Sequence, residues 1–84
     1  MHSKHEIEEE NRKIRRLRTL VDLTAMLLAQ PNTSILEAYG LIRFARNEAL
    51  KMFPGKDSVF DLIYQPRFRR IVEAKLASQG DKLN

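Results

Sequence analysis

The chain of 84 residues contains no cysteine and no tryptophan. Without cysteine there can be no disulfide, no thiolate nucleophile and no Cys-containing zinc site, so packing alone must hold the fold. The only two histidines, His2 and His5, lie near the N-terminus in a segment that offers no second shell for a metal. Because histidine is the commonest general acid or base, we expect no enzyme, no metal centre and no cofactor.

Long hydrophobic runs are also missing. The longest, residues 25–29, falls far short of the roughly 18 residues that a membrane span needs, so we expect no membrane contact. The first ten residues are acidic and lack an apolar core, which argues against a secretory or transit signal. The interpretation is a cytoplasmic protein.

The composition, 43% hydrophobic and 31% charged, is typical of one globular domain over residues 1–84. A chain of this length buries only about 60% of its unfolded surface, which leaves no room for a large pocket, so we expect no small-molecule substrate.

Proline and glycine are scarce, at three each, and most of them mark boundaries between apolar stretches with helical spacing. Ser3 with Glu6 and Ser34 with Glu37 have the spacing of N-terminal capping boxes. Together these signals predict helices over residues 3–30, 34–53, 59–64 and 66–80. The expected fold class is all-α: a small helical bundle with three principal helices and one short helix. We expect the short helix to be a buried plug. We expect residues 81–84 to fray beyond Gly80.

The first predicted helix is longer than the others, so its start must overhang the bundle. Residues 1–10 are expected to form a projecting or frayed arm. Ile7, Ile14, Val21 and Leu28 recur at seven-residue intervals, although the positions between them support a full coiled coil only weakly. An arm that reaches a second subunit or another protein would fit both the overhang and the width of the apolar stripe.

The second predicted helix departs from simple amphipathicity in two places. Leu36, Gly40 and Phe44 follow at four-residue steps on the side away from its main apolar stripe. Either the first helix wraps far enough to cover them, or Gly40 is incidental, or another chain docks there. Arg46 lies inside the apolar stripe. It either reaches solvent or an internal ion pair, for instance with Asp61, or contacts an anion at a groove.

Positive charge concentrates at the two ends of the chain. The whole chain carries 15 basic and 11 acidic residues, a net charge of +4. Residues 1–18 place four glutamates before most of their basic residues, and residues 67–84 hold three arginines close together. If the basic segments met in space, they would form a phosphate-binding surface for nucleic acid. That candidate surface consists of Arg12, Arg15, Arg16, Arg67, Arg69 and Arg70.

The function that this pattern favours is a small protein-protein interaction module, an adaptor or regulator that binds itself as a homodimer or binds another protein. Its candidate interface residues are Ile7, Leu36, Gly40 and Phe44. Nucleic-acid binding through the arginine-rich surface is the alternative, because salt-dependent phosphate contacts need only clustered cations.

Overall fold

The computed structural model describes residues 3–83 of the chain, with side chains described for residues 3–78. Four helices make up this part: α1 (Lys4–Ala29), α2 (Ile35–Met52), α3 (Asp57–Ile63) and α4 (Gln65–Leu83). The predicted all-α bundle of three principal helices and one short helix is confirmed. No described helix is both long enough and apolar enough to cross a membrane.

The serine contacts of both predicted capping boxes form. The Ser3 hydroxyl accepts a hydrogen bond from the Glu6 backbone N–H at 3.2 Å, and Ser34 accepts one from Glu37 at 3.1 Å. These contacts satisfy backbone donors that a helix start otherwise leaves unpaired. The two long helices therefore begin one residue after the serines, as the spacing predicts.

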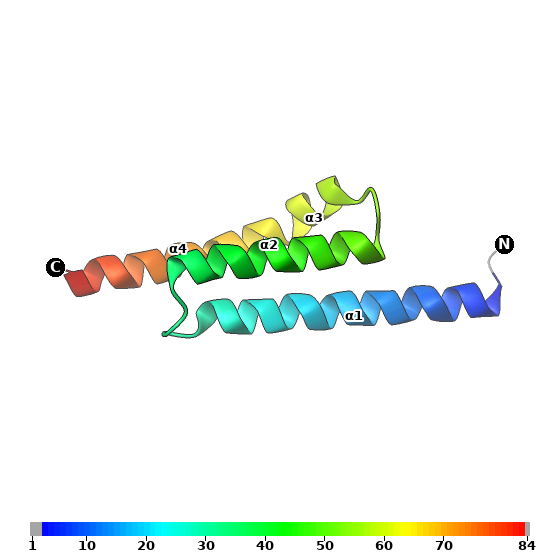
Figure 1. Ribbon diagram of the computed structural model, residues 1–84, viewed down its shortest axis with the longest axis horizontal. Helices are drawn as coiled ribbons and strands as arrows, with labels where there is room; N and C mark the ends of the chain where they lie inside the picture. Colours follow the sequence, from blue (N-terminus) through cyan, green and yellow to red (C-terminus); the bar gives the residue numbers. More distant parts are fainter. Residues whose placement is uncertain (1–2, 84) are drawn as a thin grey trace.

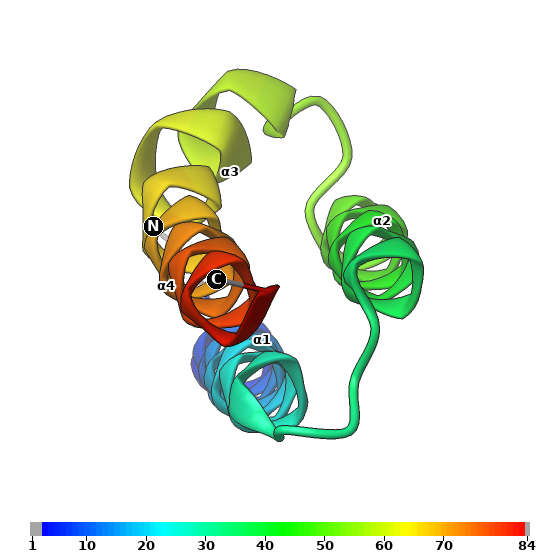
Figure 2. The ribbon, with the colours of Figure 1, turned by 90° about the vertical axis from the view of Figure 1, so that its left-hand side faces the viewer.

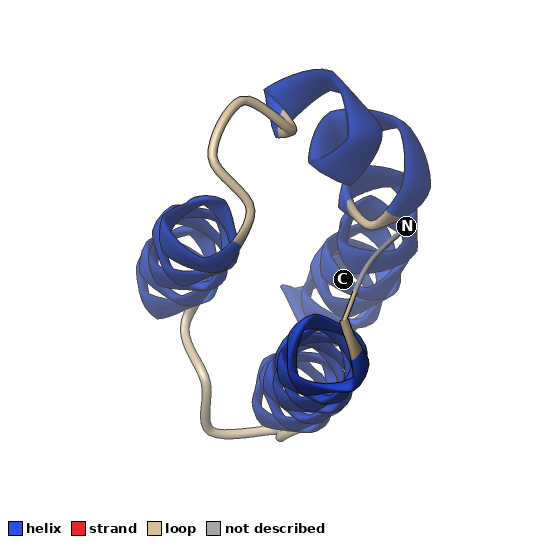
Figure 3. Cartoon of the chain, turned by 90° about the vertical axis from the view of Figure 1, so that its right-hand side faces the viewer, coloured by secondary structure: helices blue, strands red, loops and turns tan. Residues whose placement is uncertain are grey.

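The bundle is an up-down-up arrangement of the three long helices (Figure 1). α1 and α2 run antiparallel and pack side by side, while α4 packs against both and runs parallel to α1. Viewed along the long axis, the three helices form a triangle with α3 above the edge between α2 and α4 (Figures 2 and 3). The molecule is elongated, with extents of 60 × 21 × 15 Å.

The core lies where the three long helices meet. Phe68 of α4, Leu28 of α1 and Ala38 and Ala45 of α2 are fully buried. Small alanines on α2 allow the larger side chains of its neighbours to fill the centre, which is how helices approach closely. The whole buried cluster is Val21, Ala25, Leu28, Ala38, Ile42, Ala45, Ala49, Phe60, Phe68 and Val72.

Two expectations about the short elements are wrong. α3 begins at Asp57 rather than at residue 59, with Lys56 as N-cap and no side-chain cap. The Asp57 carboxylate lies 3.6 Å from Arg46. α3 is also no buried plug. Phe60 is its one buried side chain, while Leu62 and Ile63 are 78% and 56% exposed. Two turns of helix present only one face to the bundle, so the other apolar side chains remain outside.

The predicted stop at Gly80 is wrong as well, because α4 continues through it to Leu83. A glycine in a helix weakens it by about 1 kcal/mol relative to alanine but does not break it. Residues 81–83, expected to fray, therefore belong to α4, and Asn84 lies outside the described residues.

Candidate functional site

The α2 strip, defined as Leu36, Gly40 and Phe44, faces away from the core. Leu36 is 84% exposed and Phe44 58%. The buried residues of α2 lie on the opposite side of the helix, so α1 packs against that side and leaves the strip uncovered. The alternative in which α1 wraps round to cover these residues is therefore wrong. Within the described chain, nothing accounts for two large apolar side chains at these positions.

Gly40 forms the low point of this strip. A Cβ added to it would meet no atom within 4 Å, and its backbone is ordinary helix. No packing or conformational requirement inside the chain therefore explains a glycine at this position. Beside it lies a surface depression of about 430 Å³ at the seam between α1 and α2, which Leu27, Glu37 and Leu41 also line. The strip thus offers a shallow recess between two apolar projections.

The exposed apolar surface continues from the α2 strip onto α1. Leu27, which shares the depression with Gly40, is 39% exposed, and Leu23 one turn earlier is 50% exposed. Because α1 and α2 are antiparallel, the step from Leu27 to Leu23 runs the same way as the step from Gly40 to Phe44. These two leucines were not predicted as interface residues. They sit in the wide apolar stripe of α1, whose width alone indicated that one partner helix would not bury it.

The seven-residue series on α1 changes its environment along the helix. Leu28 is 0% exposed and Val21 2%, but Ile14 is 44% exposed and Ile7 50%. Figure 1 shows the reason: the first turns of α1 extend past the end of α2. Residues 4–13, which we call the arm, are helical, and none of them is buried. The stripe that builds the core therefore continues into the arm without a partner there.

An apolar cleft of about 340 Å³ lies where the arm leaves the bundle. It is formed between α1, the end of α2 and α3. Its lining is almost entirely apolar: Ile14, Leu17, Ala49, Leu50, Phe53, Lys56, Val59, Phe60 and Tyr64. The Ile14 side chain forms the edge of this cleft nearest to the arm, so the arm stripe and the cleft are continuous.

The six arginines predicted as a phosphate surface lie in different surroundings. Arg67 donates to Asp22 of α1 at 3.2 Å, an ion pair that spans the α1–α4 contact. Arg69, two residues on and so about 200° round the helix, lines a groove against α2 instead. Arg12 and Arg15 line a depression on α1 itself, and Arg16 and Arg70 are exposed. No described contact joins the α1 group to the α4 group.

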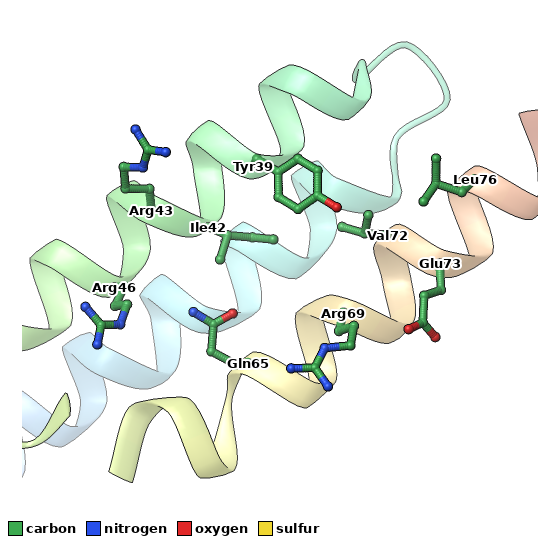
Figure 4. A pocket seen from close by; sticks show the side chains of 9 residues that line it. All are labelled: Tyr39, Ile42, Arg43, Arg46, Gln65, Arg69, Val72, Glu73 and Leu76. Carbon is green, nitrogen blue, oxygen red and sulfur yellow. The ribbon is translucent and has the colours of Figure 1, made fainter. Parts of the chain in front are cut away.

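The groove between α2 and α4, of about 750 Å³, is lined by Tyr39, Ile42, Arg43, Arg46, Gln65, Arg69, Val72, Glu73 and Leu76. Figure 4 shows Tyr39 and Ile42 reaching toward Val72, while Arg43 points away from α4. The arginines of the groove point in different directions, and Glu73 places a carboxylate among them. The groove therefore does not concentrate positive charge at one point.

Arg46 at the edge of this groove forms the ion pair that the sequence allowed. Its Nε donates to Asp61 Oδ1 at 2.8 Å and its terminal nitrogen to Oδ2 at 3.0 Å, a two-point contact from α2 to α3. Asp57 lies 3.6 Å from the same guanidinium. The hydrogen bond from Arg46 lowers the pKa of Asp61 below its usual range and raises the pKa of Arg46. Arg46 is therefore held by carboxylates of its own chain.

Among the described residues, no group of three histidine, aspartate or glutamate side chains is placed to hold a metal ion. His5 is exposed on the arm, and His2 lies outside the described residues.

Comparison with known proteins identifies no relative: no protein-family model matches the chain, and neither a curated protein nor a solved structure matches it.

Proposed function

We propose that the chain is a small protein-protein interaction module that associates with itself. The observation that carries this proposal is the exposure of large apolar side chains on its long helices, with Leu36 at 84% and Phe44 at 58%. Large contiguous apolar patches on small proteins mark sites of interaction with proteins, membranes or ligands. The α2 strip together with Leu23 and Leu27 of α1 supplies such a surface in the body of the bundle, and Ile7 and Ile14 expose apolar side chains along the arm and at its base.

The total exposed area supports the same proposal. The chain exposes 6483 Å², whereas a compact monomer of its mass is expected to expose about 5,200 Å². Its radius of gyration is 15.6 Å, against about 12 Å for a compact domain of this length. The excess area exceeds the roughly 800 Å² that one partner contributes to a standard protein interface. A second copy could therefore cover the excess.

Nucleic-acid binding has less support from the arrangement of the arginines. Arg67 is paired with Asp22, and Arg69 lies on a different side of α4. A phosphate-binding face needs several unpaired cations on one surface. No observation of the described residues favours this alternative, so we do not propose it as a second function.

Sedimentation equilibrium of the purified chain tests the proposal. We expect the mass to rise with concentration from the 9.8 kDa of one chain toward twice that value. Gly40→Leu is the probe for the α2 strip, because the open space around Gly40 lets the folded chain accept the larger side chain. Ala77→Leu, at an exposed position on the outer side of α4, away from both surfaces, is the matched control.

A mass that stays at that of one chain over the whole range would contradict the proposed self-association. If the chain associates and Gly40→Leu changes neither the mass nor the helical content, the α2 strip takes no part in the contact. A change caused equally by Ala77→Leu would mean that any added leucine alters association, and the strip would again lose its assignment.

A further inference from the structure

We infer that the arm of α1 pairs antiparallel with the arm of a second copy of this chain, about a twofold axis close to Asn11. This inference rests on the proposed self-association and adds which surface meets which. Ile7, Asn11 and Ile14 lie on one side of α1, since steps of three, four and seven residues return to the same face of a helix. That side continues the stripe buried at Val21 and Leu28.

The position of the bundle decides the orientation of the pair. Beyond Leu17 the stripe of α1 is covered by α2 and α4 of the same chain. The bundle therefore lies entirely at the C-terminal end of the arm (Figure 1). Two parallel arms that met through their stripes would bring both bundles to the same end, where each occupies the space of the other. Antiparallel arms place the two bundles at opposite ends, so the stripes can meet.

The lengths fit this arrangement. The ten residues of the arm, 4–13, span about 15 Å of helix. If Ile7 lies opposite the partner's Ile14, residue 4 lies opposite the partner's Leu17, and each arm ends where the partner's α2 begins to cover the stripe. The symmetry axis then passes close to Asn11, and every exposed turn of the arm has a counterpart.

Charge complementarity supports the same register. Glu8 and Arg15 lie seven residues apart and flank the stripe on the same side. In an antiparallel pair of helices related by a twofold axis, equivalent flanks meet, so Glu8 faces the partner's Arg15. The pair occurs twice. None of the ion pairs among the described residues involves Glu8, so this carboxylate is available to a partner.

The apolar cleft at the base of the arm gives the contact an anchor. In this register Ile7 reaches the level of the partner's Ile14, which edges the cleft. At about 340 Å³, the cleft can take one isoleucine side chain, and its Leu50, Phe53 and Val59 provide apolar walls. Burial of Ile7 there would remove from water a side chain that is 50% exposed in the single chain.

Single cysteines test the orientation, because the chain has no cysteine of its own. We expect Asn11→Cys to form a disulfide-linked dimer rapidly under mild oxidation, since the two sulfurs lie near the axis. Lys4→Cys, on the same side of the helix, is the matched control. Two copies of residue 4 would be about 20 Å apart along the helix axis, and a disulfide requires Cα atoms within roughly 7 Å, so its dimer should form far more slowly.

Each outcome separates the two proposals. Equal, fast cross-linking at both positions would indicate parallel arms and overturn the inference. Slow cross-linking at both, in a chain that sedimentation finds dimeric, would overturn the inference and leave the proposed function standing. A chain that sediments as a monomer at every concentration would overturn both.

Charge exchange provides the second test, and it detects the pairing without relying on a variant that fails to fold. Glu8→Lys places a cation opposite the partner's Arg15, and Arg15→Glu places a carboxylate opposite the partner's Glu8. Each variant alone should dimerise about tenfold more weakly than the original chain, because like charges face each other at two places. Mixed in equal amounts, the two should form a heterodimer at least as tightly as the original chain.

Circular dichroism of each variant checks that the helices persist. If the mixture associates no better than either variant alone, the arms do not pair in this register.

Discussion

Ile7 and Val21 lie on the same side of α1, yet Val21 is 2% exposed and Ile7 is 50% exposed. The two positions differ in what covers them: α2 and α4 enclose the helix at Val21, whereas the described chain offers nothing over Ile7. One apolar stripe thus serves the core at one end and is open to a partner at the other.

This contrast predicts different consequences for two similar truncations. Val21→Ala should lower the free energy of unfolding by about 1 to 3 kcal/mol, because it removes buried methyl groups. Ile7→Ala should change it by less than about 0.5 kcal/mol, as for most exposed positions, while weakening self-association. Urea unfolding at a concentration where the chain is monomeric measures the first effect, and sedimentation measures the second. Equal destabilisation by both variants would contradict the structure of α1.

Substitution by alanine should have opposite effects on stability at Gly40 and at Gly55. Gly40→Ala should stabilise the monomer by about 1 kcal/mol, because alanine has the higher helix propensity and its methyl group meets open space. Gly55→Ala should destabilise the fold, because Gly55 has φ +79°, a conformation that alanine adopts only at a cost. Thermal unfolding of the two variants gives the sign of each effect, and a loss of stability in Gly40→Ala would mean that its surroundings are not open.

Asp61→Asn should reduce stability at neutral pH by removing the two-point contact with Arg46. The pKa of Asp61 is lower in the folded chain than in the unfolded one. Its contribution is therefore complete above the unfolded pKa of about 4 and disappears as the pH falls through the lowered folded value. Denaturant unfolding of the two proteins across the acid range should show their stabilities converging below that region. A difference that persists unchanged in acid would exclude the ionised pair as its cause.

Phe68→Ala should be severely destabilising. Phe68 is 0% exposed and its ring lies 6.3 Å from that of Phe60, between centroids. Truncation of a buried phenylalanine costs about 3 to 5 kcal/mol, a large part of the stability of a small domain. Leu62→Ala, at a residue 78% exposed on α3, is the control and should leave unfolding almost unchanged. Circular dichroism at moderate temperature distinguishes them, and a large effect of Leu62→Ala would restore α3 as a buried element.

The principal helices were predictable because their signals are local. Capping serines three residues before glutamates, and the proline that follows the first helix, mark their starts and ends within one or two residues. α3 was harder. Its apolar residues suggested burial all round, but a helix of seven residues cannot turn more than one face to the bundle. A glycine ends a helix only where the chain changes direction at it, and α4 instead continues through Gly80.

The candidate surfaces were predictable in part. The spacing of Leu36, Gly40 and Phe44 identifies a second apolar face on α2, but whether α1 covers it depends on how the helices cross, which local spacing does not determine. The same holds for the arginines. Their clustering along the chain is visible in the sequence, whereas the pairing of Arg67 with Asp22 depends on the contact between α1 and α4.

The oxidation of Asn11→Cys beside that of Lys4→Cys tests the central claim most directly, because it reports both whether two chains meet through their arms and in which direction. Rapid formation of a disulfide-linked dimer by Asn11→Cys, with little by Lys4→Cys, is the predicted result. Equal rates at the two positions, whether fast or slow, would contradict the antiparallel pairing of the arms.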